Sequence, residues 1–266
     1  MKRTTVQFNA ASKYFLMAGA CGACAVLGTY LAGCFISTGF AAIAGLLYPI
    51  IGTIGSVLVL KQKVSKRGYL AIIVLLIGGV TLYSGTLISG GISGSIIGVI
   101  GGLMAAVGWG CEGIVAGKAL DMCEPDVGLH LRFCFEALIW ICILIVLTIL
   151  GFPMFSTFGL LLDPAAILVL LLLGFSFAWC YVCWYKAFPM IGVPRGQAVG
   201  SLYAACAVIF LIIFFGPAGA LGYTDETMGI IVGSTIAGLV ICLIGSYLLA
   251  SEDAEGLVSL KGGDSE

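Results

Sequence analysis

Two residues in the stretch Gly94–Lys118 could do chemistry: the carboxylate Glu112 and, three positions earlier, the indole of Trp109. The stretch is otherwise apolar and is long enough to cross a bilayer as one helix, for which about 20 residues suffice. A carboxylate inside such a helix is costly, so it usually faces a cavity or a polar partner. We expect this helix to line a substrate path, with Glu112 and Trp109 on its wall. A carboxylate that only hydrogen-bonds neighbouring Ser or Tyr residues is the structural alternative.

Glu112 lies six residues before Lys118, which places it roughly 9 Å inside the helix end at about 1.5 Å per residue. A carboxylate held at that depth can take up and release a proton, so Glu112 is also the candidate proton-coupling residue. A second carboxylate, Glu136, lies four residues after Arg132. An (i, i+4) ion pair at the membrane surface accounts for Glu136, and a substrate role is the alternative.

Aromatic side chains supply further candidates for substrate contact. Trp179 lies near the middle of its apolar run and Trp109 lies well inside a helix end, so both are poor anchors for the membrane interface. Their rings, with those of Tyr48 and Tyr203, can stack on an organic substrate or cation, and helix packing is the alternative. Pro49 removes a backbone hydrogen bond and is a candidate hinge beside Tyr48, whereas a static kink is the other interpretation.

The remaining reactive side chains indicate neither a metal centre nor a catalytic group. Cys21 and Cys24, like Cys180 and Cys183, have the spacing of redox or metal motifs but lie in apolar runs without a neighbouring histidine. The apolar runs also hold no histidine, no paired aspartates and no deep Ser/Lys pair of the kind that an intramembrane hydrolase needs. We therefore expect no metal, no cofactor and no enzymatic activity.

The composition predicts an all-α polytopic membrane protein. Of the 266 residues, 61% are hydrophobic and 9% are charged, whereas a soluble domain has about 25% charged residues. No acidic or basic tract points to nucleic acid. Backbone polar groups in hydrocarbon must be satisfied within their segment, so each long apolar run is expected to be a helix. Eight transmembrane helices are predicted: Tyr14–Phe35, Phe40–Leu60, Tyr69–Ile88, Ser95–Gly117, Phe133–Phe152, Ala165–Tyr185, Gln197–Gly216 and Met228–Ala250.

The positive charges all fall on one side of these eight spans. The 12 Lys and Arg lie in the N-terminal segment, in alternate connections and in the tail, and the opposite connections have none. Since positive charge stays in the cytoplasm during insertion, we expect a multi-pass protein of the cell membrane with both termini in the cytoplasm. The residues assigned to the cytoplasmic side are Lys2, Arg3, Lys13, Lys61, Lys63, Lys66, Arg67, Lys118, Arg132, Lys186, Arg195 and Lys261.

Short segments of the chain recur. Ala44–Tyr48 reads AGLLY and Val199–Tyr203 reads VGSLY, and a looser match links Gly78–Gly85 with Gly238–Gly245. Spans one to three therefore match spans six to eight. Because span one runs outward while span six runs inward, the two copies are expected to be inverted across the membrane. Many secondary transporters have this architecture, with the substrate site near the midplane where the copies meet.

Three longer segments carry a family resemblance. Leu46–Leu82 combines a span, a short basic turn and a glycine-containing span; Gly108–Lys118 reads GWGCEGIVAGK; and Trp184–Tyr203 opens on an aromatic-Tyr-basic-Ala turn. Together they resemble the drug/metabolite transporter superfamily, specifically proteins with EamA-type repeats, which usually have ten helices in two inverted repeats of five. The resemblance implies a partial inverted repeat of such a bundle, whose first two helices are apparently missing.

The resemblance also implies a division of the chain and a function. Residues 1–88 would be the remainder of the first repeat with three helices, 89–250 the second repeat with five, and 251–266 a cytoplasmic polar tail. The implied function is a secondary transporter, an exporter of a small organic metabolite across the cytoplasmic membrane by alternating access. In the related small multidrug exporters a glutamate of the opening helix couples protons to substrate, and Glu112 is similar in position.

Two alternatives to a complete transporter stay open. The first is a non-transporting or truncated membrane subunit that needs a partner, and an intramembrane enzyme is the second. A start codon placed late and a natural eight-helix variant both explain the absent pair of helices. The expected partners are a small-molecule substrate and the lipid bilayer, with a homodimer or partner helices completing the bundle.

Overall fold

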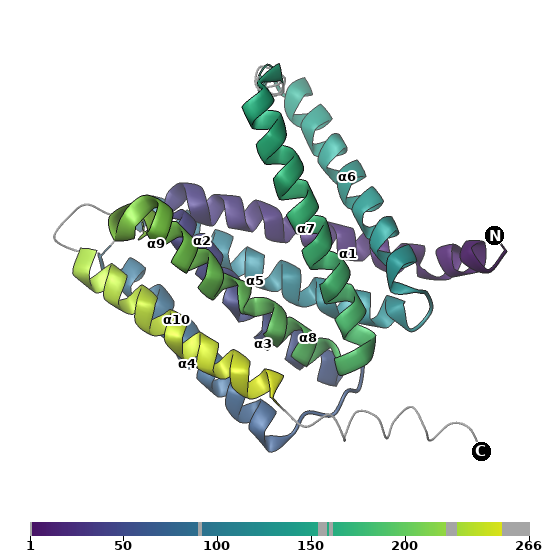
Figure 1. The fold of residues 1–266 in the computed structure, drawn as a ribbon, viewed down its shortest axis with the longest axis horizontal. Coiled ribbons are helices and arrows are strands. Elements are labelled where there is room, and N and C mark those ends of the chain that lie inside the picture. The colour runs from purple at the N-terminus through teal and green to yellow at the C-terminus, as the bar shows by residue number, and fades with distance from the viewer. Residues whose placement is uncertain (1, 90–91, 154–158, 160–161, 222–227, 252–266) are drawn as a thin grey trace.

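The computed structural model describes residues 2–89, 92–153, 159, 162–221 and 228–251, so the predicted tail lies outside the described residues apart from Ser251. The described residues form helices and no strand, as the composition predicts. The elements are α1 (Lys2–Phe35), α2 (Thr38–Ala44), the 3-10 turn η1 (Gly45–Leu47), α3 (Tyr48–Leu58), α4 (Lys66–Ser89), α5 (Ile92–Leu120), α6 (Pro125–Ile149), α7 (Pro164–Ile191), α8 (Val193–Ser201), α9 (Tyr203–Leu221) and α10 (Met228–Ala250) (Figure 1).

Six segments of the described chain are long and apolar enough to cross a membrane. They are Asn9–Phe35, Thr38–Leu58, Ile96–Leu120, Pro125–Ile149, Pro164–Ile191 and Val232–Ala250. The two other predicted spans, Tyr69–Ile88 and Gln197–Gly216, correspond to α4 and to α8 with α9. The chain is therefore an all-α protein with several membrane-spanning helices, and the count of eight, like the inverted repeat, stays a prediction.

Two of the predicted spans are interrupted rather than continuous. The span predicted for Phe40–Leu60 is α2 and α3 joined by the 3-10 turn η1, and the span predicted for Gln197–Gly216 is divided at Leu202 into α8 and α9. Both interruptions fall on the recurring segments AGLLY and VGSLY, immediately before Tyr48 and Tyr203. The interrupted helices also pack on each other, α2 on α9 and α3 on α8. The backbone dihedral angles of Tyr48 and Leu202, at the two junctions, stay right-handed helical, and hydrogen bonds to the residue three positions earlier form there: the Tyr48 N–H donates to Gly45 O and the Leu202 N–H to Val199 O.

Small residues bring two pairs of helices into close contact. A Cβ atom at Gly101 of α5 would lie 2.6 Å from the carbonyl oxygen of Gly28 and 2.8 Å from the amide nitrogen of Ala32, both in α1. At the α4–α10 contact, a Cβ atom at Gly238 would lie 2.7 Å from the amide nitrogen of Leu82. These glycines let backbones touch, and in lipid such van der Waals packing drives helix association. The helix predicted for Gly94–Lys118 is thus fixed against α1.

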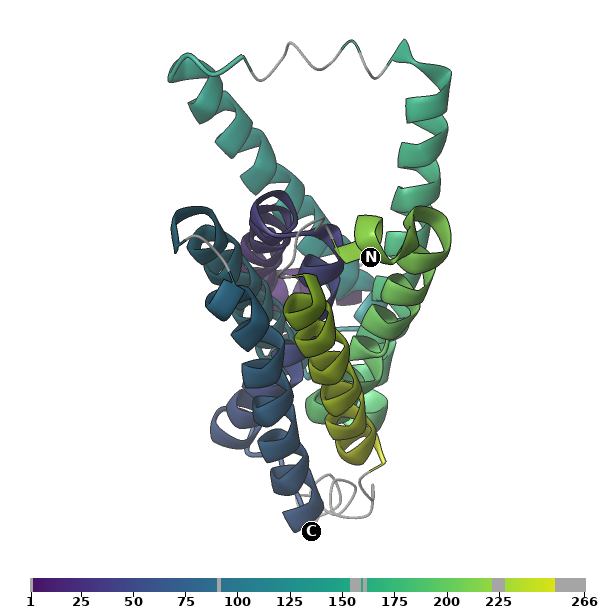
Figure 2. The ribbon, with the colours of Figure 1, turned by 90° about the vertical axis from the view of Figure 1, so that its left-hand side faces the viewer.

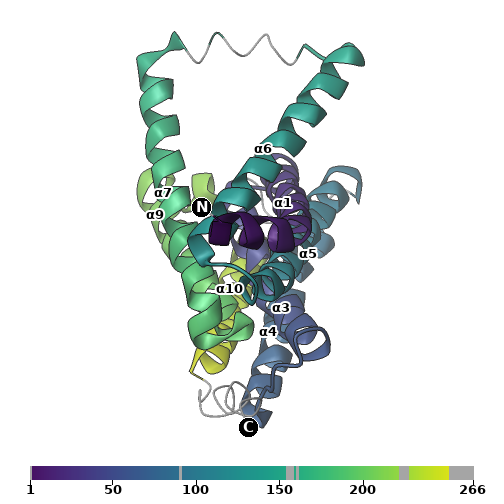
Figure 3. The ribbon, with the colours of Figure 1, turned by 90° about the vertical axis from the view of Figure 1, so that its right-hand side faces the viewer.

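Helices α6 and α7 diverge from the rest of the bundle. Figures 2 and 3 show them leaving the bundle on opposite sides, so that their outer halves are far apart. The outer part of α7 exposes a continuous apolar surface, from Leu168 to Phe175. Within the bundle α6 contacts α1 and α5, and α7 contacts α5 and α8. The candidate site lies there.

We predict that Gly101→Ala destabilises the bundle, because the added methyl group meets backbone atoms of α1 that cannot rotate away. Overpacking of this kind costs about 1–3 kcal/mol. Gly229→Ala in α10 is the matched control, since a Cβ atom there meets nothing within 4 Å. Unfolding of the purified protein by SDS in mixed micelles measures the difference. Equal stability of the two variants would contradict the backbone contact between α1 and α5.

Candidate functional site

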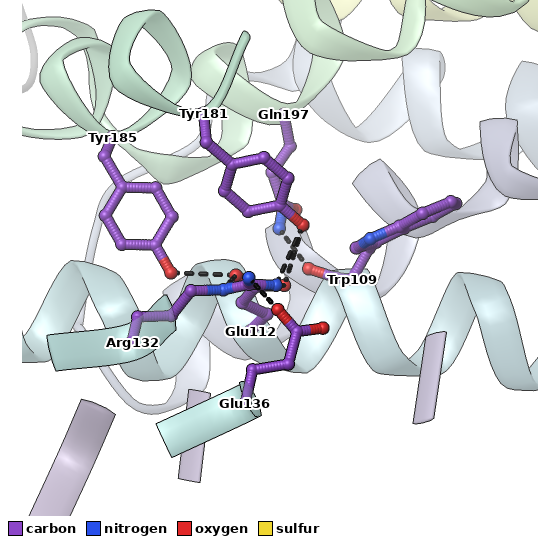
Figure 4. Close-up of polar contacts among 7 residues, drawn as sticks. All are labelled: Trp109, Glu112, Arg132, Glu136, Tyr181, Tyr185 and Gln197. Atoms are coloured by element: carbon purple, nitrogen blue, oxygen red, sulfur yellow. Dashed lines mark hydrogen bonds and ion pairs between the residues drawn. The ribbon is translucent and has the colours of Figure 1, made fainter. Parts of the chain in front are cut away.

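Three charged side chains meet inside the bundle. Arg132 of α6 donates through Nε to Glu112 Oε1 of α5 at 2.7 Å and through Nη2 to Glu112 Oε2 at 3.3 Å, while Nη1 donates to Glu136 (Figure 4). Arg132 and Glu112 have no solvent-accessible surface, and Glu136 is 8% exposed. We call these three residues the ion cluster. It joins α5 to α6 through charge-assisted hydrogen bonds.

Two tyrosines of α7 donate further hydrogen bonds to the Glu112 carboxylate. Tyr185 donates to Glu112 Oε1 at 2.8 Å, and Tyr181 donates to Glu112 Oε2 at 3.4 Å while accepting from Arg132 Nη2 at 3.0 Å. Spaced four residues apart, the two tyrosines share the buried face of α7. The Arg132 guanidinium also lies over the Tyr181 and Phe133 rings, at 4.3 and 4.7 Å from their centroids. Each carboxylate oxygen of Glu112 thus accepts hydrogen bonds from both Arg132 and a tyrosine.

Helix α1 passes over the ion cluster at a glycine. A Cβ atom at Gly22 would overlap Arg132 Nη2 and lie 3.1 Å from Glu112 Oε2. Any larger residue would therefore displace the guanidinium. Buried charges are tolerated only when they are paired and fully hydrogen-bonded, and the absence of a side chain at Gly22 leaves room for that arrangement.

An aromatic group lies beside the ion cluster, where the two interrupted helices meet α5. Trp109 packs edge-on against Tyr48 at 6.1 Å and against Tyr203 at 6.4 Å between ring centroids, and Tyr48 also packs against Trp184 at 5.9 Å. Gln197 of α8 donates to the carbonyl oxygen of Trp109 at 3.0 Å, which fixes α8 to α5. The interruptions are therefore held by packing and by a side-chain bond to the central helix.

An open cavity of about 1040 Å³ lies between α6 and α7, and α1, α2, α5 and α9 also line it. Its size is that of a site for a small organic molecule. The described lining is apolar and aromatic apart from a few polar groups, and Glu136 is its charged side chain. The lining residues are Val26, Thr29, Tyr30, Gly33, Cys34, Thr38, Ala41, Ala42, Trp109, Phe133, Glu136, Ala137, Trp140, Leu170, Leu173, Gly174, Phe177 and Tyr203.

The structure brings together four of the five residues predicted to bind substrate, although in different positions. Trp109 and Tyr203 line the cavity, Tyr48 lies buried behind them, and Glu112 lies behind Glu136 in the ion cluster. Trp179 departs from the prediction: it is 65% exposed and lies outside the cavity. The reason is the position of Trp179 around the axis of α7. The inward face of α7 carries Tyr181, and Trp179, two residues earlier, is turned from it by about 200° at about 100° per residue.

Two expectations for charged residues need correction. Arg132 was predicted to lie in a cytoplasmic connection, but α6 begins at Pro125, seven residues before it, and Arg132 is fully buried. Its (i, i+4) pair with Glu136 does form, inside the bundle instead of at the membrane surface. The start of α6 was missed because polar residues precede the apolar run. Pro after Glu124 was the available signal, since Pro favours the first turn of a helix.

Pro49, the predicted hinge, lies in the first turn of α3, where it follows the interruption instead of causing a kink within a continuous helix. A proline in the first helical turn costs no hydrogen bond that the helix would otherwise make. The change from α-helical to 3-10 hydrogen bonding lies just before Pro49, at Gly45–Leu47.

Comparison with known proteins supports a membrane transport context. No protein-family model matches the chain. A curated protein of Clostridium kluyveri named "uncharacterized transporter" is 31% identical over 181 residues, which are 67% of this chain and 56% of the relative. The match thus spans little more than half the length of that relative.

We predict that Arg132→Gln strongly destabilises the protein, because it leaves two carboxylates buried without a cation. Removing one partner of a buried ion pair costs about 3–5 kcal/mol. Lys186→Gln is the control: it breaks the Lys186–Asp126 pair, 3.0 Å long, whose side chains are 49% and 72% exposed. A pair exposed in this way contributes about 0–1 kcal/mol. Unfolding by SDS measures the free energy of unfolding of both variants. An equal decrease in the two would mean that the ion cluster is not buried as described.

Proposed function

We propose that the chain belongs to a secondary transporter of the EamA-type drug/metabolite transporter class, which exports a small organic metabolite across the cell membrane by alternating access. The observation that carries the proposal is the cavity lined by α2, which precedes the turn η1, and by Tyr203, the first residue of α9. Many secondary transporters place the substrate site near the membrane midplane beside discontinuous helices. The transporter name of the C. kluyveri relative supports the same class.

In this proposal Trp109 and Tyr203 contact the substrate, and Tyr48 positions Trp109 from behind. The junction of η1 with Pro49 acts as the hinge about which α2 moves relative to α3. Both interruptions lie beside the cavity, so a change at either would alter access to it. Glu112 is the proposed proton-coupling residue, acting through its contacts with Arg132 and the two tyrosines.

A counterflow assay tests transport. Proteoliposomes of the purified chain are loaded with a defined mixture of amino acids, nucleosides, carboxylic acids and quaternary amines, and mass spectrometry measures the exchange of isotope-labelled counterparts. We expect saturable exchange of one class. Trp109→Leu should slow it at least about fivefold, because a lost ring contact is worth about 1 kcal/mol. Trp179→Leu, outside the cavity, should exchange at the wild-type rate.

The same proteoliposomes test proton coupling when a pH gradient is imposed. The gradient should drive accumulation by the wild-type chain, and Glu112→Gln should exchange substrate without responding to the gradient. An undiminished response in Glu112→Gln would remove Glu112 from the coupling role. Absence of exchange of every class would contradict transport by this chain alone and favour the alternative of a subunit that needs a partner, which chemical crosslinking in native membranes would then test.

The proposed topology places both termini in the cytoplasm. The sequence assigns the 10 Lys and Arg other than the buried Arg132 and Arg195 to one side, and positive charge is retained in the cytoplasm. Green fluorescent protein fused to the C-terminus should therefore fluoresce in intact cells, and alkaline phosphatase fused at the same position should be inactive. Active alkaline phosphatase there would contradict the topology.

A further inference from the structure

The cavity places a carboxylate among aromatic rings. Glu136 is the charged residue of its described lining, and Trp140, one turn later on the same face of α6, lines it as well. Trp109 and Phe177 face the same space from α5 and α7. In Figure 4 one Glu136 oxygen is directed at Arg132 while the other points away from it. The second oxygen has no drawn contact with Arg132, and Glu136 belongs to the cavity lining.

The ion cluster does not balance its own charge. Glu112 and Glu136 supply two negative charges and Arg132 supplies one positive charge. Arg132 gives two of its nitrogens to Glu112 and a single one to Glu136. The uncompensated charge is therefore concentrated on Glu136, the member of the ion cluster that lines the cavity. An unbalanced charge in an apolar site is costly, so a bound cation or a proton must neutralise it.

The described lining suits a cation and disfavours an anion. It holds no lysine, arginine or histidine to pair with a negative ligand, and Glu136 would repel one. The Phe133 ring is already covered by the Arg132 guanidinium. The rings of Trp140, Trp109 and Phe177 also line the cavity, and aromatic rings attract cations.

We propose that the cavity binds an organic monocation, with Glu136 as the residue that binds its charge and the aromatic rings as its walls. The inference rests on the proposed function and names the substrate class of that site. Arg132 stays bound to Glu112 when the cation is present, so the ligand compensates Glu136 and leaves a neutral pair behind it. Glu136, rather than Glu112, then sets the preference for positive charge.

Binding of benzyltrimethylammonium tests the proposal. The tritiated cation is added to purified, immobilised protein, and scintillation proximity measures saturable binding. Its neutral carbon isostere, neopentylbenzene, has the same shape without the charge and should compete at least about tenfold more weakly, because it gains neither the ion pair nor the cation–π contact. Equal competition by the isostere, or no saturable binding of the cation, would overturn the proposal.

Substitutions locate the effect at Glu136. Glu136→Gln should weaken binding of the cation at least about tenfold and leave binding of the isostere unchanged. Asp126→Asn is the matched control, because Asp126 is an exposed carboxylate on the same helix and lies outside the cavity lining. Trp140→Leu keeps the carboxylate and should weaken cation binding by at least about threefold through loss of the ring face. Unchanged affinity in both Glu136→Gln and Trp140→Leu would contradict the assignment.

The outcomes separate this inference from the proposed function. Saturable binding of the cation without exchange in proteoliposomes would retain the cation site and reject transport by this chain. Exchange of carboxylic acids or neutral solutes, with no binding of the cation, would retain transport and reject the cation site. A melting temperature measured for every variant shows which of them are folded.

Discussion

The ion pair between Glu112 and Arg132 is the interaction on which the rest of the site depends. Neither side chain meets solvent, so each is tolerated only because the other is within hydrogen-bond distance. Their pairing sets the register of α5 against α6, requires a glycine where α1 crosses, and orients Tyr181 and Tyr185 of α7 toward the same point. One cluster of polar contacts thus joins three helices, α5, α6 and α7, and α1 packs over it at Gly22.

The same pairing accounts for the character of the cavity. Because Arg132 is held mainly by Glu112, the carboxylate of Glu136 is left facing the space between α6 and α7. Above that point α6 and α7 separate, and below it the interrupted helices bring Tyr48 and Tyr203 against Trp109. These contacts produce a cavity whose described lining is apolar and aromatic and contains one carboxylate, Glu136.

The sequence predicted most of the helices and part of the site. Hydrophobicity alone located α5 and α10 closely, because a run of apolar residues bounded by polar ones has a single interpretation in lipid. The recurring AGLLY and VGSLY segments were recognised, but the interruptions at them were not predicted, since a 3-10 turn in an apolar run leaves no change in composition.

Glu112 was found because it stands alone among apolar neighbours. Its partner Arg132 was assigned to a connection, because a charged residue near the end of an apolar run looks the same in a loop and in a helix. Trp179 was chosen by depth, whereas the face of α7 that points inward is set by Tyr181 and Tyr185.

A cryo-electron microscopy map of the chain in lipid nanodiscs with benzyltrimethylammonium tests the central claim most directly. The account predicts density for the cation within about 5 Å of the Glu136 carboxylate, beside the Trp140 ring and with the Glu112–Arg132 pair intact, a separation at which a cation meets both a carboxylate and a ring face. A map in which lipid tails or packed side chains fill that space, with Glu136 turned into the protein, would contradict it.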